Sequence, residues 1–216
     1  MTGSEILTSW LIIVVVNTAA TLSPGPAFAM TVRNSMAYDR RIAILTTIGL
    51  GGGVGVIAFL VLFGFAALLS QSAFLFNLLK YLGAAYLVFI GIKALLAKPH
   101  AESSGEKSEI SSQKTLSNIG ALKLGLLTNL LNPKGIVFFT AVYAQFVAPD
   151  TPWMVLVLYG LTSIIIETTW FTIVAFILTD SRIKRRFMRV SHWIERLCGG
   201  LLLLLGVRLA LTKSLG

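Results

Sequence analysis

The segment Asn17-Thr18-Ala19-Ala20-Thr21-Leu22-Ser23-Pro24-Gly25-Pro26 lies where a first membrane helix would be expected to continue without interruption. Each proline removes a backbone donor, and Pro24 also disfavours the helical conformation at Ser23. The helix must therefore break here, which frees backbone carbonyl and amide groups at membrane depth. Because lipid cannot form hydrogen bonds with these groups, the break has to face protein, water or a ligand.

A second break of the same kind is predicted about 110 residues further along, at Asn129-Leu130-Leu131-Asn132-Pro133-Lys134-Gly135. Asn132 would cap the half-helix that begins at Pro133. The half-helix that begins near Gly25 would present free amide groups, and a helix N-terminus favours an anion such as a carboxylate. Two broken helices in matching positions of two halves indicate the binding site of a transporter. The alternative is that both breaks are simple kinks.

The composition predicts an all-α integral membrane protein. The 216 residues are 56% hydrophobic and 12% charged, whereas soluble domains carry about 25% charged residues. Residues 42–79 contain no charged residue and no proline. Since one span needs about 20 residues, we expect Ser70-Gln71-Ser72 to divide this run into two spans. Alternating segments typical of a membrane barrel are absent.

We predict six transmembrane helices arranged as two inverted three-helix repeats, with the first and fourth helices broken. Residues 1–97 would form the first repeat, 98–118 a polar cytoplasmic linker and 119–216 the second repeat. Each half has an odd number of spans, so the second half must sit inverted in the membrane. The spans are expected at 5–22 with a half-helix at 26–38, then at 42–69, 73–97, 119–147, 152–178 and 193–211.

The amino end has some features of a signal peptide, but it contains Glu5 and no Lys or Arg, so we expect an uncleaved first helix. The second span contains the pairs Gly49/Gly53 and Gly51/Gly55. Such small-xxx-small pairs let helix backbones approach closely, within one protomer or between protomers of a homo-oligomer.

The distribution of Lys and Arg predicts the orientation. Basic residues concentrate in loops 33–41, 98–118 and 182–196, which should be cytoplasmic, with both termini outside. This pattern explains the net charge of +9 better than nucleic-acid binding does. The run from Arg182 to Arg186 is expected to contact anionic lipid.

Glu167 is the sharpest functional candidate, because it lies in the middle of the apolar fifth span. Intramembrane carboxylates are costly and usually serve a function. Glu167 could bind a substrate ammonium group or take and release a proton. Alternatively, it could be a structural partner of Lys80 or Lys134, or a carboxyl that simply stays protonated. Lys134 could also neutralise a substrate carboxylate, and Lys80 could extend to the interface.

The predicted substrate site gathers the polar and helix-breaking residues of both segments. They are Asn17, Thr21, Ser23, Pro24, Gly25, Pro26, Asn129, Asn132, Pro133, Lys134 and Glu167.

The sequence lacks the residues that disulfide, metal-binding or catalytic chemistry would require. Cys198 is the only cysteine, and His100 and His192 flank basic loops, so no disulfide and no metal site are expected. No nucleophile–base set and no nucleotide-binding lysine motif occur. We therefore expect neither an enzyme nor a cofactor, and uphill transport would depend on an ion gradient or a partner.

Three motifs resemble those of the LysE/RhtB amino-acid exporter family. They are Ser23-Pro24-Gly25-Pro26, Gly83-Ala84-Ala85-Tyr86-Leu87 with Gly91, and Asn129-Leu130-Leu131-Asn132-Pro133-Lys134. The resemblance implies a six-span exporter of amino acids or related metabolites in the bacterial inner membrane, coupled to protons by antiport. Two positions depart from the family pattern. Glu167 stands where aspartate is more common, and Ala27 stands where many members have asparagine.

The resulting hypothesis places an amino-acid zwitterion between the two halves. Its carboxylate would face the amides near Gly25 and Lys134, and its ammonium group would face Glu167 or carbonyls around Thr21 and Asn129. One rival is an inorganic-ion or metal exporter on a related scaffold, which would need several acidic or His ligands. Another is a non-transporting membrane subunit. The sequence leaves the substrate and the oligomeric state open.

Overall fold

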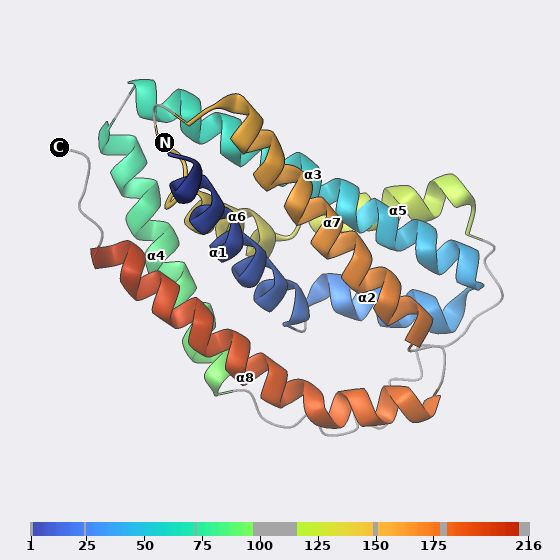
Figure 1. Cartoon of the computed structure of the whole chain (residues 1–216). Coiled ribbons are helices and arrows are strands. Elements are labelled where there is room, and N and C mark those ends of the chain that lie inside the picture. The colour runs from blue at the N-terminus through green and yellow to red at the C-terminus, as the bar shows by residue number, and fades with distance from the viewer. Residues whose placement is uncertain are drawn as a thin grey trace.

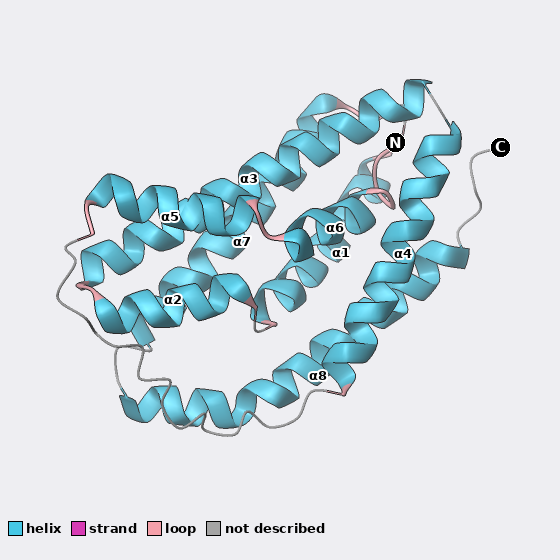
Figure 2. Ribbon diagram, turned by 180° about the vertical axis from the view of Figure 1, so that it is seen from behind, coloured by secondary structure: helices cyan, strands magenta, loops and turns pink. Residues whose placement is uncertain are grey.

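The computed structural model describes residues 2–23, 25–71, 73–96, 116–148, 151–177 and 181–211. Every regular element in these ranges is an α-helix (Figure 2). Pro24 and most of the predicted linker lie outside the described residues. The helices are α1 (Gly3–Leu22), α2 (Pro26–Ala37), α3 (Arg40–Gln71), α4 (Ala73–Leu95), α5 (Asn118–Leu130), α6 (Pro133–Tyr143), α7 (Trp153–Ile177) and α8 (Ser181–Leu211).

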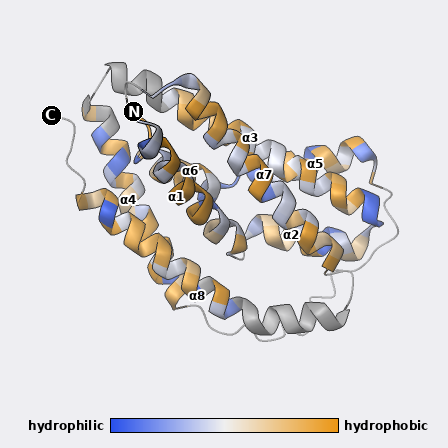
Figure 3. Ribbon diagram, viewed as in Figure 1, coloured by the Kyte–Doolittle hydropathy of each residue, from blue (hydrophilic) through white to orange (hydrophobic). Residues whose placement is uncertain are grey.

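Four segments among the described residues are long and apolar enough to cross a membrane: Gly3–Leu22, Arg40–Gly64, Asn77–Leu95 and Trp153–Ile177. Hydrophobic residues dominate these helices in Figure 3. Many large apolar side chains point outwards, such as Leu60, which is 67% exposed, as expected for a surface that contacts lipid. The chain is thus an all-helical membrane protein, while the six-span inverted repeat stays a prediction.

Both predicted helix breaks are confirmed. α1 ends at Leu22, Ser23 and Gly25 have extended backbone, and α2 starts with Pro26 at its first turn. α5 ends at Leu130, Asn132 is extended, and α6 starts with Pro133. Proline suits the first turn of a helix because the amide hydrogen it lacks would have no partner there.

The helices form two groups joined by the broken segments (Figure 1). α3 packs against both α5 and α7, and α4 packs along α8. α1 contacts α7 and α8, and α6 contacts α3 and α4, so these two helices connect the groups. At the two breaks, Ser23 and Asn132 are buried, whereas Leu131 is 72% exposed.

Close backbone contact explains the glycines of α3. A Cβ atom on Gly49 would overlap the Leu122 carbonyl of α5, and one on Gly53 would lie 2.6 Å from the Leu126 carbonyl oxygen. On the opposite side, a Cβ on Gly51 would overlap the Thr168 hydroxyl of α7. The prediction that the two glycine pairs allow close helix packing is therefore confirmed, within one chain.

Three predicted segments have wrong boundaries. The predicted loop 33–41 is mostly helical, because α2 extends to Ala37 and α3 begins at Arg40. α8 begins at Ser181, not near Trp193, so the basic segment 182–196 is helical and not a loop. It contains no proline or glycine, and Ile183, Phe187, Val190 and Ile194 recur at helical spacing. Similarly, α6 ends at Tyr143 and not at Val147, because residues 144–146 form a turn.

Gly53→Ala should destabilise the protein, because the added methyl group meets the Leu126 carbonyl at 2.6 Å and Asn129 Cβ at 2.8 Å. Overpacking of this kind costs about 1–3 kcal/mol. The matched control is Gly52→Ala, whose added carbon would find only Leu126 Cδ1, at 3.8 Å. Thermal unfolding in detergent should show a lower Tm for Gly53→Ala and an unchanged or higher Tm for Gly52→Ala. Equal Tm values would contradict the packing argument.

Candidate functional site

The two helix breaks line one cavity. Of the predicted site residues, it is lined by Asn17, Thr21, Ser23, Gly25, Pro26, Asn129, Asn132, Lys134 and Glu167. The cavity offers about 60 Å³ to the centres of water-sized molecules, room for a few waters. Pro133 begins α6 beside the cavity, and Pro24 lies outside the described residues. The structure thus brings together segments more than 100 residues apart in the sequence.

Glu167 is the acidic group of the cavity, and it is 8% exposed. Asn129 Nδ2 of α5 donates a hydrogen bond to its Oε1 at 2.9 Å, and Thr21 Oγ1 of α1 donates to its Oε2 at 3.0 Å. Asn129 Nδ2 also donates to the Leu50 carbonyl of α3 at 2.9 Å. Each carboxylate oxygen therefore has a donor from a different helix, which lowers the cost of burying the charge.

Lys134 is the cationic group of the same cavity. It lies in the first turn of α6, and its Nζ donates to Ser23 Oγ at 3.3 Å, across the break between α1 and α2. Lys134 and Glu167 both line the cavity. The cavity thus holds one acidic and one basic side chain, both with further capacity for hydrogen bonds.

Lys80 belongs elsewhere in the molecule. It lies in α4 and is 3% exposed, and its Nζ is 5.5 Å from the centroid of the Tyr81 ring. It is not among the residues that line the cavity. The expectation that Lys80 extends to the interface stays a prediction, whereas Lys134 is the lysine that lines the cavity with Glu167.

The two breaks leave their helix N-termini in different states. At α6, Asn132 Oδ1 accepts a hydrogen bond from the Lys134 amide at 3.1 Å, as its predicted capping role requires. At α2, no side chain of the described residues caps the N-terminus, and residues 25–28 line the cavity. The N-terminus of α2, which carries partial positive charge, therefore faces the cavity.

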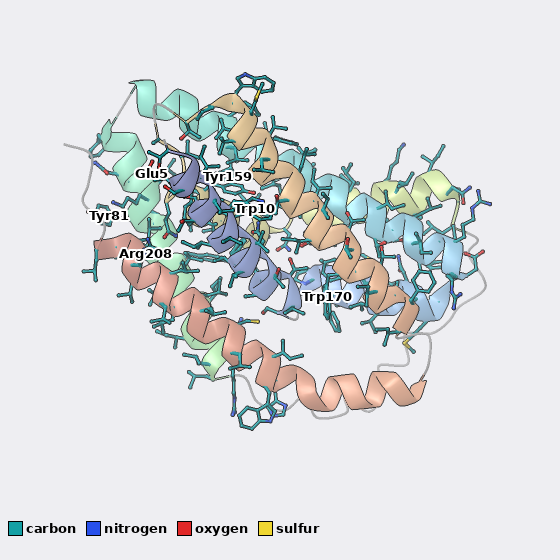
Figure 4. The ribbon with its side chains drawn as sticks, in the orientation of Figure 1. Glu5, Trp10, Tyr81, Tyr159, Trp170 and Arg208 are labelled. Atoms are coloured by element: carbon teal, nitrogen blue, oxygen red, sulfur yellow. The ribbon has the colours of Figure 1, made fainter. Side chains whose placement is uncertain are left out.

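Sequence reasoning missed a second polar cluster one helical turn from Glu167. Asn17 Nδ2 donates to Ser163 Oγ at 2.6 Å, and the Tyr143 hydroxyl pairs with Ser163 Oγ at 2.7 Å. Nearby, Trp10 Nε1 donates to Thr162 Oγ1 at 2.9 Å across the α1–α7 interface (Figure 4). Ser163 could have been found, because it precedes Glu167 by four residues and shares its helix face.

The aromatic lining of the cavity was also not predicted. Phe28, Phe138, Phe139 and Phe171 complete its walls. Phe28 and Phe171 belong to a small cluster against which Trp170 packs, while Phe138 and Phe139 belong to the main hydrophobic core. Phenylalanine is common in every membrane helix, so the sequence carries no signal that singles out these four.

Two broken helices that enclose a buried acid and a partly buried base are more typical of a membrane carrier than of an enzyme. Comparison with known proteins supports this class. The model of the family described as LysE type translocator matches residues 18–213. The chain therefore belongs to the LysE family, and it is a transporter.

Two relatives match nearly the whole chain. The threonine efflux protein of Escherichia coli (strain K12) is 30% identical over 210 residues, covering 94% of this chain and 98% of its own length. The homoserine/homoserine lactone efflux protein of Salmonella typhimurium (strain LT2) is 29% identical over 214 residues, with 94% and 97% coverage. Comparison with solved structures gives no significant match.

Asn132→Ala should destabilise α6, because the Lys134 amide loses its side-chain acceptor at the break. Loss of such a cap costs about 1 kcal/mol. Asn132→Ser is the matched control, since serine keeps an oxygen that can accept the same bond. In detergent, Tm should be highest for wild type, lower for Asn132→Ser and lowest for Asn132→Ala. An Asn132→Ala protein as stable as wild type would show that the cap is dispensable.

Proposed function

We propose that this chain exports small hydroxylated amino acids from the bacterial cytoplasm in exchange for protons. The cavity at the two breaks is the observation that carries this proposal, because it pairs Glu167 with Lys134 and the N-terminus of α2. Family membership and the threonine and homoserine efflux relatives support the substrate class.

A zwitterionic amino acid matches the charges of the cavity. The substrate carboxylate binds the first amides of α2, near Gly25, together with Lys134 Nζ. Nζ already bonds to Ser23 and lies 3.6 Å from the position that a Gly25 Cβ would occupy. The ammonium group binds the Glu167 carboxylate, which charge-assisted hydrogen bonds favour. Phe28 and Phe171 enclose the rest of the substrate.

Glu167 also carries the coupling proton in this proposal. A proton on the carboxyl group removes the charge that holds the substrate ammonium, so substrate and proton compete for one site. Exchange of one for the other then couples export to the proton gradient. A metal or inorganic cation fits the cavity less well, because Glu167 is its only acidic lining residue among those described.

The proposed architecture is two inverted halves, 1–97 and 119–216, joined by residues 98–118. Helix contacts support it, because the corresponding helices α3 and α7 pack on each other, and so do α4 and α8. The protein then lies in the inner membrane with basic segments 33–41, 98–118 and 182–196 in the cytoplasm.

Efflux of labelled threonine from preloaded cells tests the function. Wild type should export threonine, and an uncoupler should abolish the export. Glu167→Gln should reduce export by at least about tenfold, because charged hydrogen bonds contribute about 1.5–3 kcal/mol.

The control for this experiment is Glu5→Gln. Glu5 lies in the exposed capping box of α1, where glutamine can replace glutamate. Glu5→Gln should export at the wild-type rate. Wild-type levels of uncoupler-sensitive export by Glu167→Gln would show that Glu167 does not couple export to protons. If the wild-type protein exports no amino acid, the proposed function is wrong.

Cysteine labelling tests the proposed orientation. Cys198 is 4% exposed and can be replaced by alanine to give a background without cysteine. In this background, Trp153→Cys places a thiol at the start of α7, and Ala37→Cys places one at the end of α2, both at exposed positions. A membrane-impermeant maleimide should label Trp153→Cys in intact cells, and Ala37→Cys only after permeabilisation. The reverse pattern would invert the topology.

A further inference from the structure

The hydrogen bonds of Ser163 determine how the Asn17 amide is oriented. The Ser163 hydroxyl donates its hydrogen to the Tyr159 carbonyl at 3.1 Å, and its Oγ lies 2.7 Å from the Tyr143 hydroxyl. Ser163 Oγ therefore accepts from Asn17, whose Nδ2 lies 2.6 Å away. The amide nitrogen is thus held by Ser163, which is itself paired with Tyr143.

This orientation leaves the amide oxygen of Asn17 as an acceptor. Asn17 is 2% exposed and lines the cavity, and its Oδ1 has no hydrogen-bond partner among the residues that the structure describes. A buried acceptor without a donor costs folding free energy, because it has lost its hydrogen bonds to water. Such a cost is recovered when a ligand in the cavity supplies a hydrogen-bond donor.

The position of this acceptor relative to Glu167 indicates which ligand group it meets. Asn17 and Thr21 are four residues apart on α1, and Thr21 donates to Glu167 Oε2. Residues at this spacing lie about one turn apart on the same helix face. Ser163 and Glu167 have the same spacing on α7. The Asn17 amide therefore lies one turn from the carboxylate that takes the ammonium group.

We propose that Asn17 Oδ1 accepts a hydrogen bond from the side-chain hydroxyl of the substrate, and that Ser163 and Tyr143 are positioning residues that hold this acceptor in place. This inference rests on the proposed function, and it explains why the transporter would prefer amino acids with a side-chain hydroxyl. An amino acid with a methyl group in place of the hydroxyl fits the same space but leaves the acceptor unpaired. Sites built around a hydroxyl reject such isosteres strongly.

The test compares export of threonine with export of valine, its near-isostere, from cells loaded with both. Wild type should prefer threonine by at least about tenfold, as expected for loss of one buried hydrogen bond. Asn17→Leu, which removes the acceptor at similar volume, should bring the ratio close to one. Ser163→Ala and Tyr143→Phe should lower it in part, because the amide loses its anchor.

Thr162→Val is the matched control. It removes the neighbouring hydroxyl on α7, which pairs with Trp10 and does not line the cavity. Its threonine-to-valine ratio should equal that of wild type. Because the readout is a ratio of two substrates in the same cells, it does not depend on how much of each variant reaches the membrane. If Asn17→Leu does not fold, Ser163→Ala and Tyr143→Phe still decide the question.

The outcomes separate the inference from the function. If wild type exports threonine and valine equally, or if the three variants keep the wild-type preference, the role of Asn17 is overturned while amino-acid export stands. If wild type exports neither amino acid nor any other hydroxylated one, the proposed function fails and the inference fails with it.

Discussion

The buried carboxylate of Glu167 is the constraint on which the rest of the site depends. A charge in a membrane interior must be surrounded by donors, and here Thr21 and Asn129 supply one for each oxygen. Asn129 can reach Glu167 only because α5 packs tightly on α3, where a Cβ on Gly53 would lie 2.8 Å from Asn129 Cβ. The glycines of α3 therefore serve the site as well as the packing, since a wider helix separation would remove a donor from the buried charge.

At both helix breaks the amides of a helix N-terminus need hydrogen-bond partners, but the two breaks meet this need in different ways. This difference gives the cavity a positive end and a negative end. Asn132 caps α6 from within the chain, so this N-terminus is already partnered. The N-terminus of α2 has no side-chain cap among the described residues and faces the cavity beside Lys134. Positive potential therefore gathers near Gly25, while Glu167 supplies negative potential. In the proposed function these two poles would orient a zwitterion, which a pair of equally capped breaks would not achieve.

Features of the fold and the site could be predicted from the sequence where a residue acts on its own segment of chain, and not where its role depends on residues distant in the sequence. The breaks were predictable because Pro26 and Pro133 act on their own backbone, and Glu167 was conspicuous because a carboxylate in an apolar span is costly. Ser163 could be found only through its four-residue spacing from Glu167, and the four phenylalanines gave no signal, since aromatic side chains fit any membrane helix and gain a role only from their neighbours. The start of α8 was misplaced because basic charge was taken to indicate a loop, although an amphipathic helix carries it equally well.

The polar contacts of the site also connect the two proposed halves, which bears on how the carrier moves. Thr21 meets Glu167, Asn17 meets Ser163 and Ser23 meets Lys134, each pair joining residues 1–97 to residues 119–216. If the two halves rotate against each other during transport, these three hydrogen bonds must break when the cavity opens. A substrate or a proton on Glu167 competes with the donors that hold the carboxylate, so occupancy changes the strength of the connection between the halves. Coupling in this view needs no separate relay, because the group that binds the cargo also holds the halves together.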